Sequence, residues 1–143
     1  MNKEQLRLIA QQIASLNGLH QTLLGKLGSS ATEGQSAGSS LTVVDGAIVA
    51  HSFGHRIDVA WRPVLNGSAQ PFLEYKFLVK WEGEQVEVNV LHLYPDLAFY
   101  SPKPGAVGRD LVCRLDNSYL CRQLMEQVAS ALVGSAVFAP RAA

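Results

Sequence analysis

The feature that most constrains this chain is a regular alternation of apolar and polar residues through its centre. Residues 55–62, 73–81 and 85–90 each follow this pattern. In residues 73–81 the apolar positions are Leu73, Tyr75, Phe77, Val79 and Trp81. Side chains alternate between the two faces of a β-strand, so a period of two with one apolar face predicts antiparallel strands that are covered on one side.

A turn at Glu82-Gly83 would fix how residues 73–81 pair with residues 85–90. Both apolar sets then lie on one face of the hairpin, and a shift of one residue would move one set to the opposite face. The predicted pairs are Val79 with Val86, Phe77 with Val88 and Tyr75 with Val90. Asp45-Gly46 marks either a further tight hairpin or a bulge in one longer strand.

Apolar residues at helical spacing flank this central part. Near the N-terminus, positions separated by three and four residues form a heptad seam, which consists of Leu6, Ile9, Ile13, Leu16, His20, Leu23 and Leu27. Asn17-Gly18 lies inside this segment and could end one helix and start another. Near the C-terminus, Leu120, Leu124, Val128 and Leu132 predict a helix that stops near Gly134.

The seam needs a surface that covers it. It could pack on the sheet of its own domain, pair with the seam of another copy, or lie on a membrane surface. The last reading is the weakest, because the polar face of the segment carries few lysines or arginines.

Residues 28–40 contain no large apolar side chain and are rich in glycine and serine. Such a segment cannot offset its own ordering entropy by burial, so we predict a flexible linker. The chain then divides into an N-terminal helical arm (1–27), this linker (28–40), an α+β domain (41–134) and a frayed tail (135–143). The predicted fold is α+β, an antiparallel sheet of five or six strands with the N- and C-terminal helices packed on one face.

Composition excludes several classes of protein. The 143 residues carry no net charge and 48% of them are apolar, which excludes a polycation and a disordered chain. No apolar run approaches the ~18 residues of a membrane span, and polar side chains interrupt residues 8–16, which excludes a signal peptide there. Two cysteines are too few for a disulfide scaffold. We therefore expect a cytoplasmic protein whose cysteines are reduced.

Few residues indicate chemistry at a particular site. A three-residue turn within residues 51–55 would place His51 opposite His55, close enough to share a metal ion. A third ligand is missing, and no acid–base pair, activated nucleophile or phosphate-binding loop is recognisable, so we expect no metal and no cofactor. A possible basic face lies on the polar side of the sheet, where Arg56, Arg62, Lys76 and Lys80 are mixed with Asp58, Glu74 and Glu87.

These observations favour a non-catalytic protein-interaction module over an enzyme. We expect it to act as a homodimer through the seam and to engage a further, unidentified protein, as an adaptor or small chaperone-like protein does. The alternative is a nucleic-acid- or small-ligand-binding domain that uses the basic face or a pocket under the C-terminal helix. Nucleic acid is disfavoured, because the aromatic residues share the apolar face, which the helices are expected to cover.

Overall fold

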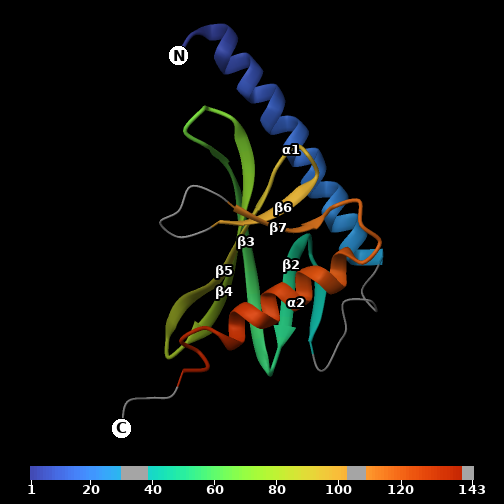
Figure 1. Cartoon of the computed structure of the whole chain (residues 1–143), viewed down its shortest axis with the longest axis vertical. Coiled ribbons are helices and arrows are strands. Elements are labelled where there is room, and N and C mark those ends of the chain that lie inside the picture. The colour runs from blue at the N-terminus through green and yellow to red at the C-terminus, as the bar shows by residue number, and fades with distance from the viewer. Residues whose placement is uncertain (30–38, 103–108, 140–143) are drawn as a thin grey trace.

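A computed structural model describes residues 1–29, 39–102 and 109–139. In these residues the chain forms two helices and seven strands (Figure 1). In chain order they are α1 (Lys3–Ser29), β1 (Ser40–Val44), β2 (Ala47–Ser52), β3 (His55–Leu65), β4 (Pro71–Trp81), β5 (Glu84–Leu93), β6 (Ala98–Pro102), β7 (Arg109–Arg114) and α2 (Leu120–Val133).

Each strand pairs antiparallel with the next one along the chain, so the sheet has the order β1-β2-β3-β4-β5-β6-β7. The predicted α+β class and antiparallel sheet are confirmed. The predicted number of strands is too low, since the described part of the sheet has seven. Asp45-Gly46 is a hairpin turn and not a bulge, and the short strand β6 carries no alternation that the sequence reveals.

Tight two-residue turns join three of the strand pairs. Both central residues of each turn have positive φ, as a type I′ turn requires, and glycine takes the second place each time. The turns are Asp45-Gly46, Phe53-Gly54 and Glu82-Gly83. The predicted turn at Glu82-Gly83 is therefore confirmed.

A β-bulge in β5 changes the predicted register of its hairpin with β4. The observed pairs are Val79 with Val86, Phe77 with Asn89 and Tyr75 with Leu91. Val88 is the extra residue, without a partner in β4. The prediction is right next to the turn and wrong beyond the bulge, because one extra residue exchanges the faces of everything that follows it. Val90 consequently lies opposite Lys76, on the polar face.

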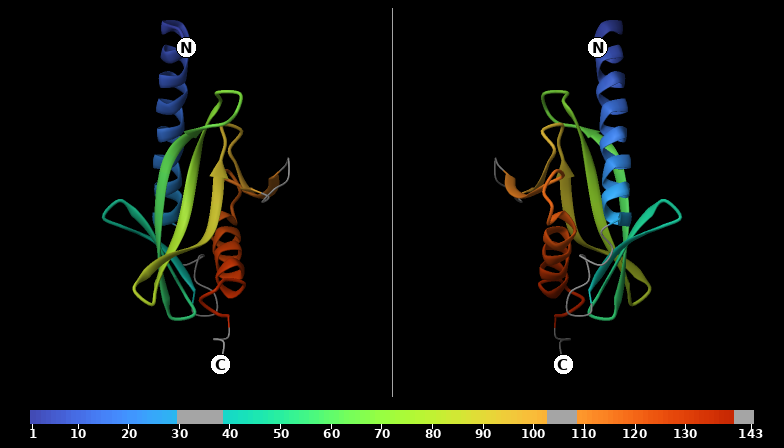
Figure 2. Two further views of the ribbon diagram at one scale, coloured as in Figure 1. Left: turned by 90° about the vertical axis from the view of Figure 1, so that its left-hand side faces the viewer. Right: turned by 90° about the vertical axis from the view of Figure 1, so that its right-hand side faces the viewer.

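The sheet is curved, and both helices lie on its concave side (Figure 2). Leucines of α1, the apolar stripe of α2 and the inward residues of the strands form one buried cluster. Its members include Leu16, Leu23 and Leu27 from α1, Ile57, Tyr75 and Val79 from the strands, and Leu124, Val128 and Leu132 from α2. The prediction that both helices pack on one face of the sheet is confirmed.

Helix α1 continues through Asn17-Gly18, so the predicted alternative of two helices is wrong. Its first turn is closed by a reciprocal pair of hydrogen bonds: Gln5 N–H donates to Asn2 Oδ1, and Asn2 N–H donates to Gln5 Oε1. This capping box satisfies two donors that a helix start leaves free. Gly134 caps α2 where the sequence predicts its end.

The predicted domain boundaries fall on the structure as follows. Of the predicted linker, residues 30–38 lie outside the described residues, whereas Gly28 and Ser29 belong to α1 and Ser40 belongs to β1. In the predicted tail, residues 140–143 lie outside the described residues, and Val137 is buried in the core cluster.

Candidate functional site

The seven seam residues of α1 divide between two environments. Leu16, His20, Leu23 and Leu27 are buried on the concave side of the sheet. Toward the N-terminus, Leu6 keeps 56% of its surface exposed, and Ile9 and Ile13 are half-buried. Figures 1 and 2 show why, since the start of the helix extends beyond the sheet. We call residues 3–15 the projecting half of α1 and residues 16–29 its docked half.

His20 lies where the docked half meets the sheet. Its ring stacks on Trp61 with 3.8 Å between the ring centroids, and its Nδ1 lies 2.8 Å from Tyr75 Oη. Burial lowers the pKa of His20 and raises the pKa of Tyr75, so both groups are neutral near pH 7. Neutral groups that hydrogen-bond each other can be buried without a large desolvation cost.

Lys26 holds the other end of the docked half. Its Nζ donates a hydrogen bond of 2.7 Å to the carbonyl oxygen of Leu115, which lies between β7 and α2. A charged donor makes a stronger hydrogen bond than a neutral one. The docked half is thus fixed at both ends, by His20 and by Lys26.

The projecting half has the opposite character, because it is helical without comparable burial. Leu8 is 53% exposed in addition to Leu6. An isolated helix shorter than ~12–15 residues is marginally stable in water. The capping box of Asn2 and Gln5 nevertheless specifies where this helix begins. An apolar stripe on a defined but uncovered helix is a surface that a partner can cover.

Strand β3 presents a second uncovered surface. It pairs with β2 only over His55–Asp58, whereas its pairing with β4 extends to Leu65. Residues 59–65, which we call the free segment of β3, therefore have no described neighbour strand on one side. Within β3, Ile57 alone is buried, and Trp61 and Leu65 are 39% and 42% exposed. The alternation of apolar and polar residues does not reveal this edge. Pro63 was a usable signal for it, because proline within sheets is confined to edges and bulges.

The two surfaces adjoin each other. Trp61 belongs to the free segment, and its ring stacks on His20 in the docked half. Beyond that contact, the projecting half and the end of β3 extend toward the same end of the molecule (Figure 2). Side chains at odd positions of β3 share the face of Ile57, so Trp61, Pro63 and Leu65 lie on the concave side with α1.

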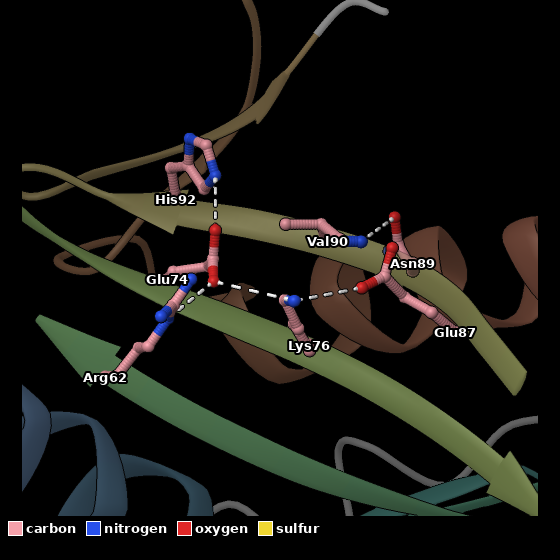
Figure 3. A network of polar contacts seen from close by, with 7 residues as sticks. All are labelled: Arg62, Glu74, Lys76, Glu87, Asn89, Val90 and His92. Carbon is pink, nitrogen blue, oxygen red and sulfur yellow. Dashed lines mark hydrogen bonds and ion pairs between the residues drawn. The ribbon is translucent and has the colours of Figure 1, made fainter. Parts of the chain in front are cut away.

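The predicted basic face lies on the opposite, convex side of the sheet, and three of its four basic residues form ion pairs with acids. Figure 3 shows the pairs of Arg62 and Lys76. Glu74 Oε1 lies 3.1 Å from Arg62 Nε and 4.0 Å from Lys76 Nζ. Lys76 Nζ also lies 3.4 Å from Glu87 Oε1. Arg56 forms a further ion pair with Asp58 at 3.0 Å. Mixed charge of this kind gives little net attraction for a polyanion.

Aromatic residues on the convex side are also engaged. Phe72 is buried and stacks on Tyr94, and the guanidinium of Arg109 lies 3.9 Å from the ring centres of both Tyr94 and Tyr100. Burial lowers the pKa of His92 more than the neighbouring Glu74 raises it. Single-strand binders need exposed rings beside unneutralised cations. This face therefore offers less to nucleic acid than the spacing of its lysines and arginines suggests.

A polar cleft lies under the C-terminal helix, where the sequence analysis placed a possible pocket. It has a volume of about 420 Å³ and is bounded by β6, β7 and α2. Its lining residues are Ser101, Asp110, Leu111, Val112, Gln123, Glu126 and Gln127. Gln123 Oε1 has no hydrogen-bond partner among the described residues. A smaller hollow of about 220 Å³ lies on the convex side beside Ala60.

The two candidate metal-binding histidines are not opposite each other. Because the turn has two residues, Ser52 pairs with His55 and His51 pairs with Arg56. The predicted three-residue turn is wrong, and the geometric reason for a shared metal ion is lost with it. In the part of the chain that the structure describes, no three metal-ligating side chains come together.

Comparisons with protein-family models, with curated proteins and with solved structures found no match to this chain. Among the described residues, neither helix is both long enough and apolar enough to cross a membrane. Any function must therefore be inferred from the geometry of the chain itself.

Proposed function

We propose that this protein is a non-catalytic protein-interaction module that forms a homodimer through the projecting half of α1 and presents that assembly to a protein partner. The observation that carries the proposal is the apolar stripe of the projecting half, where Leu6 is 56% exposed and Ile9 and Ile13 are only half-buried, on the part of α1 that extends beyond the sheet. A second copy supplies an identical stripe, so one interaction covers two exposed surfaces.

Two further observations support this proposal. The projecting half carries few charges, and Arg7 is engaged by Glu4 at 2.9 Å, so little charge must be desolvated when the stripe is covered. Cys113 and Cys121 are both buried and neither forms a disulfide, which suits the reducing cytoplasm in which we expect the protein to work.

The test is the state of association of the full chain, measured by analytical ultracentrifugation over a range of concentrations. A chain that begins at Ser39 would be a poor comparison, because it lacks Leu16, Leu23 and Leu27 of the core. The better variant is Leu6→Glu with Ile13→Glu, which adds charge to the stripe and leaves the core intact. Leu111→Glu is the matched control, since Leu111 is 60% exposed on β7.

We expect the full chain and the Leu111→Glu variant to be dimers. We expect the double variant to be a monomer whose far-ultraviolet circular dichroism spectrum loses at most the helical signal of residues 3–15. A full-length chain that remains monomeric at high micromolar concentration would refute the homodimer.

The second candidate is a small-ligand site in the cleft under α2. The unpaired acceptor Gln123 Oε1 favours it, because buried polar groups are normally hydrogen-bonded. With carboxylates from Asp110 and Glu126 in the lining, the cleft suits a small ligand rich in hydrogen-bond donors, such as an amine. Calorimetric titration with a diamine, beside the Gln123→Leu variant, tests this candidate.

A further inference from the structure

The free segment of β3 is an apolar edge that nothing in the described chain pairs with. Of its seven residues, Arg62 alone is charged, and Arg62 already pairs with Glu74. Proteins rarely leave an edge of this composition open, because unpaired backbone groups beside apolar side chains promote aggregation. Something is therefore expected to cover this segment in solution.

An added strand is a poor occupant for this edge. Ser52 and His55 close a two-residue hairpin, so they exchange both of their backbone hydrogen bonds. Because hydrogen-bonded positions alternate along an antiparallel strand, the odd-numbered residues of β3 direct their N–H and C=O groups toward the β2 side. Beyond Asp58 the same alternation directs the backbone groups of Val59, Trp61, Pro63 and Leu65 to the open edge. Pro63 has no N–H at the centre of this row, so any strand added here would have an interrupted ladder.

A helix that packs by its side chains does not need the missing donor. The projecting half of α1 is such a helix, and its length suits the free segment. Residues 3–15 extend about 20 Å at about 1.5 Å per residue, and residues 59–65 extend about 23 Å at about 3.3 Å per residue. In its own chain the projecting half leaves Trp61 and Leu65 exposed, so this helix would have to come from another copy.

We propose that in the homodimer the projecting half of each α1 docks on the free segment of β3 of the other copy, over Trp61 and Leu65. This inference rests on the proposed homodimer and names the surface that the stripe occupies. The alternative within a homodimer is stripe against stripe, as in a short coiled coil.

The area of contact favours the reciprocal arrangement. A helix about 10 Å wide offers roughly 200 Å² over the projecting half, and a single strand about 4.8 Å wide offers roughly 110 Å² over the free segment. Stripe against stripe would bury roughly 400 Å² in total, whereas two stripes on two free segments would bury roughly 600 Å². Stable interfaces bury about 1,200–2,000 Å², so the reciprocal arrangement comes closer to that range.

Disulfide trapping distinguishes the two arrangements. One batch of full-length chain carries Leu6→Cys, and a second, with a different affinity tag, carries Leu65→Cys. Each batch is first oxidised alone. The two batches are then mixed, left to exchange subunits, and oxidised together. Cys113 and Cys121 are buried, so the unmodified chain measures any background from them. Leu6→Cys mixed with Leu111→Cys is the matched control, because Leu111 is equally accessible but lies on β7.

We expect a disulfide between the two tags in the Leu6→Cys and Leu65→Cys mixture, and at most a trace in the Leu111→Cys mixture or with Leu6→Cys alone. In ultracentrifugation, Leu65→Glu should weaken dimerisation by about tenfold or more, as charge in the centre of an interface does. Efficient trapping of Leu6→Cys with itself, with Leu65→Glu still dimeric, would overturn this inference and leave the proposed homodimer standing. No trapping together with a monomeric full chain would overturn both.

Discussion

The two halves of α1 are one helix with one seam, yet they differ in almost every physical respect. The docked half places Leu16, Leu23 and Leu27 in the core, where 1% of the surface of each residue is exposed. The projecting half repeats the same spacing and leaves Leu6 more than half exposed. The helical spacing of apolar residues thus identifies the helix and its apolar face. Which surface covers that face depends on how far the sheet extends beneath the helix.

The largest predicted difference between the halves concerns leucine truncation. Leu23→Ala should lower the free energy of unfolding by ~2–5 kcal/mol, because it opens a cavity in the core. Leu6→Ala should change the stability of the monomer by no more than ~0.5 kcal/mol. Urea unfolding at a protein concentration too low for dimerisation measures the change in stability of each variant. Equal losses would mean that the projecting half is also covered within its own chain.

The anchor at Lys26 should have the next largest effect. Lys26→Met keeps most of the apolar stem and leaves the carbonyl oxygen of Leu115 without this donor, so we expect a loss of about 1.5–3 kcal/mol. Lys3→Met in the projecting half is the control and should be nearly neutral. Urea unfolding again provides the measurement, and a Lys26→Met variant as stable as the unmodified chain would show that the docked half does not depend on this bond.

A smaller effect should appear as a pH dependence. Burial lowers the pKa of His20 in the folded state below the value of 6.5 that it has when unfolded. The unfolded chain therefore binds more protons in acid, and stability is full above about pH 6.5 and declines as the pH falls toward the folded pKa. His20→Gln should remove this part of the decline. The pKa of His92 is also lowered by burial, so His92→Gln separates its contribution. Identical pH profiles for the unmodified chain and His20→Gln would contradict the assignment.

The smallest predicted change is a gain in stability at the junction of the two halves. A Cβ atom at Gly18 would meet nothing within 4 Å, and alanine favours a helix over glycine by about 1 kcal/mol, so Gly18→Ala should raise the melting temperature by a few degrees. Gly46→Ala is the contrast, because Gly46 has a φ of +78° and alanine there should destabilise the turn. A destabilising Gly18→Ala would indicate that the junction must bend.

The fold was predictable where local patterns act alone. Alternation in residues 73–81 and the turn at Glu82-Gly83 are properties of a few neighbouring residues, and both predictions are confirmed. The register of β5 was not predictable beyond the turn, because Val86, Val88 and Val90 alternate perfectly in sequence and nothing in that local pattern marks Val88 as an extra residue.

The site was predictable to a smaller extent. The seam residues are correctly placed on one helix, but their division into two halves depends on where the sheet ends. The free segment of β3 arises because β2 is shorter than β3, and strand lengths follow from pairing across the whole sheet. The sequence predicts that Glu74 shares the polar face with Arg62 and Lys76, but not that its carboxylate lies within 4.0 Å of both.

The bulge in β5 also determines how the chain tolerates a change of length. Val88 has no partner, so a chain that loses one residue between Glu87 and Leu91 can form a regular ladder in which Val86 and Leu91 both keep their places on the concave side. A deletion within β4 has no such reserve, because β4 contributes no extra residue to either of its two ladders. Shortening β5 would remove the local twist that a bulge adds. Variation in length is therefore expected to be tolerated better in β5 than in β4, and to alter the curvature of the sheet before it alters which residues form the core.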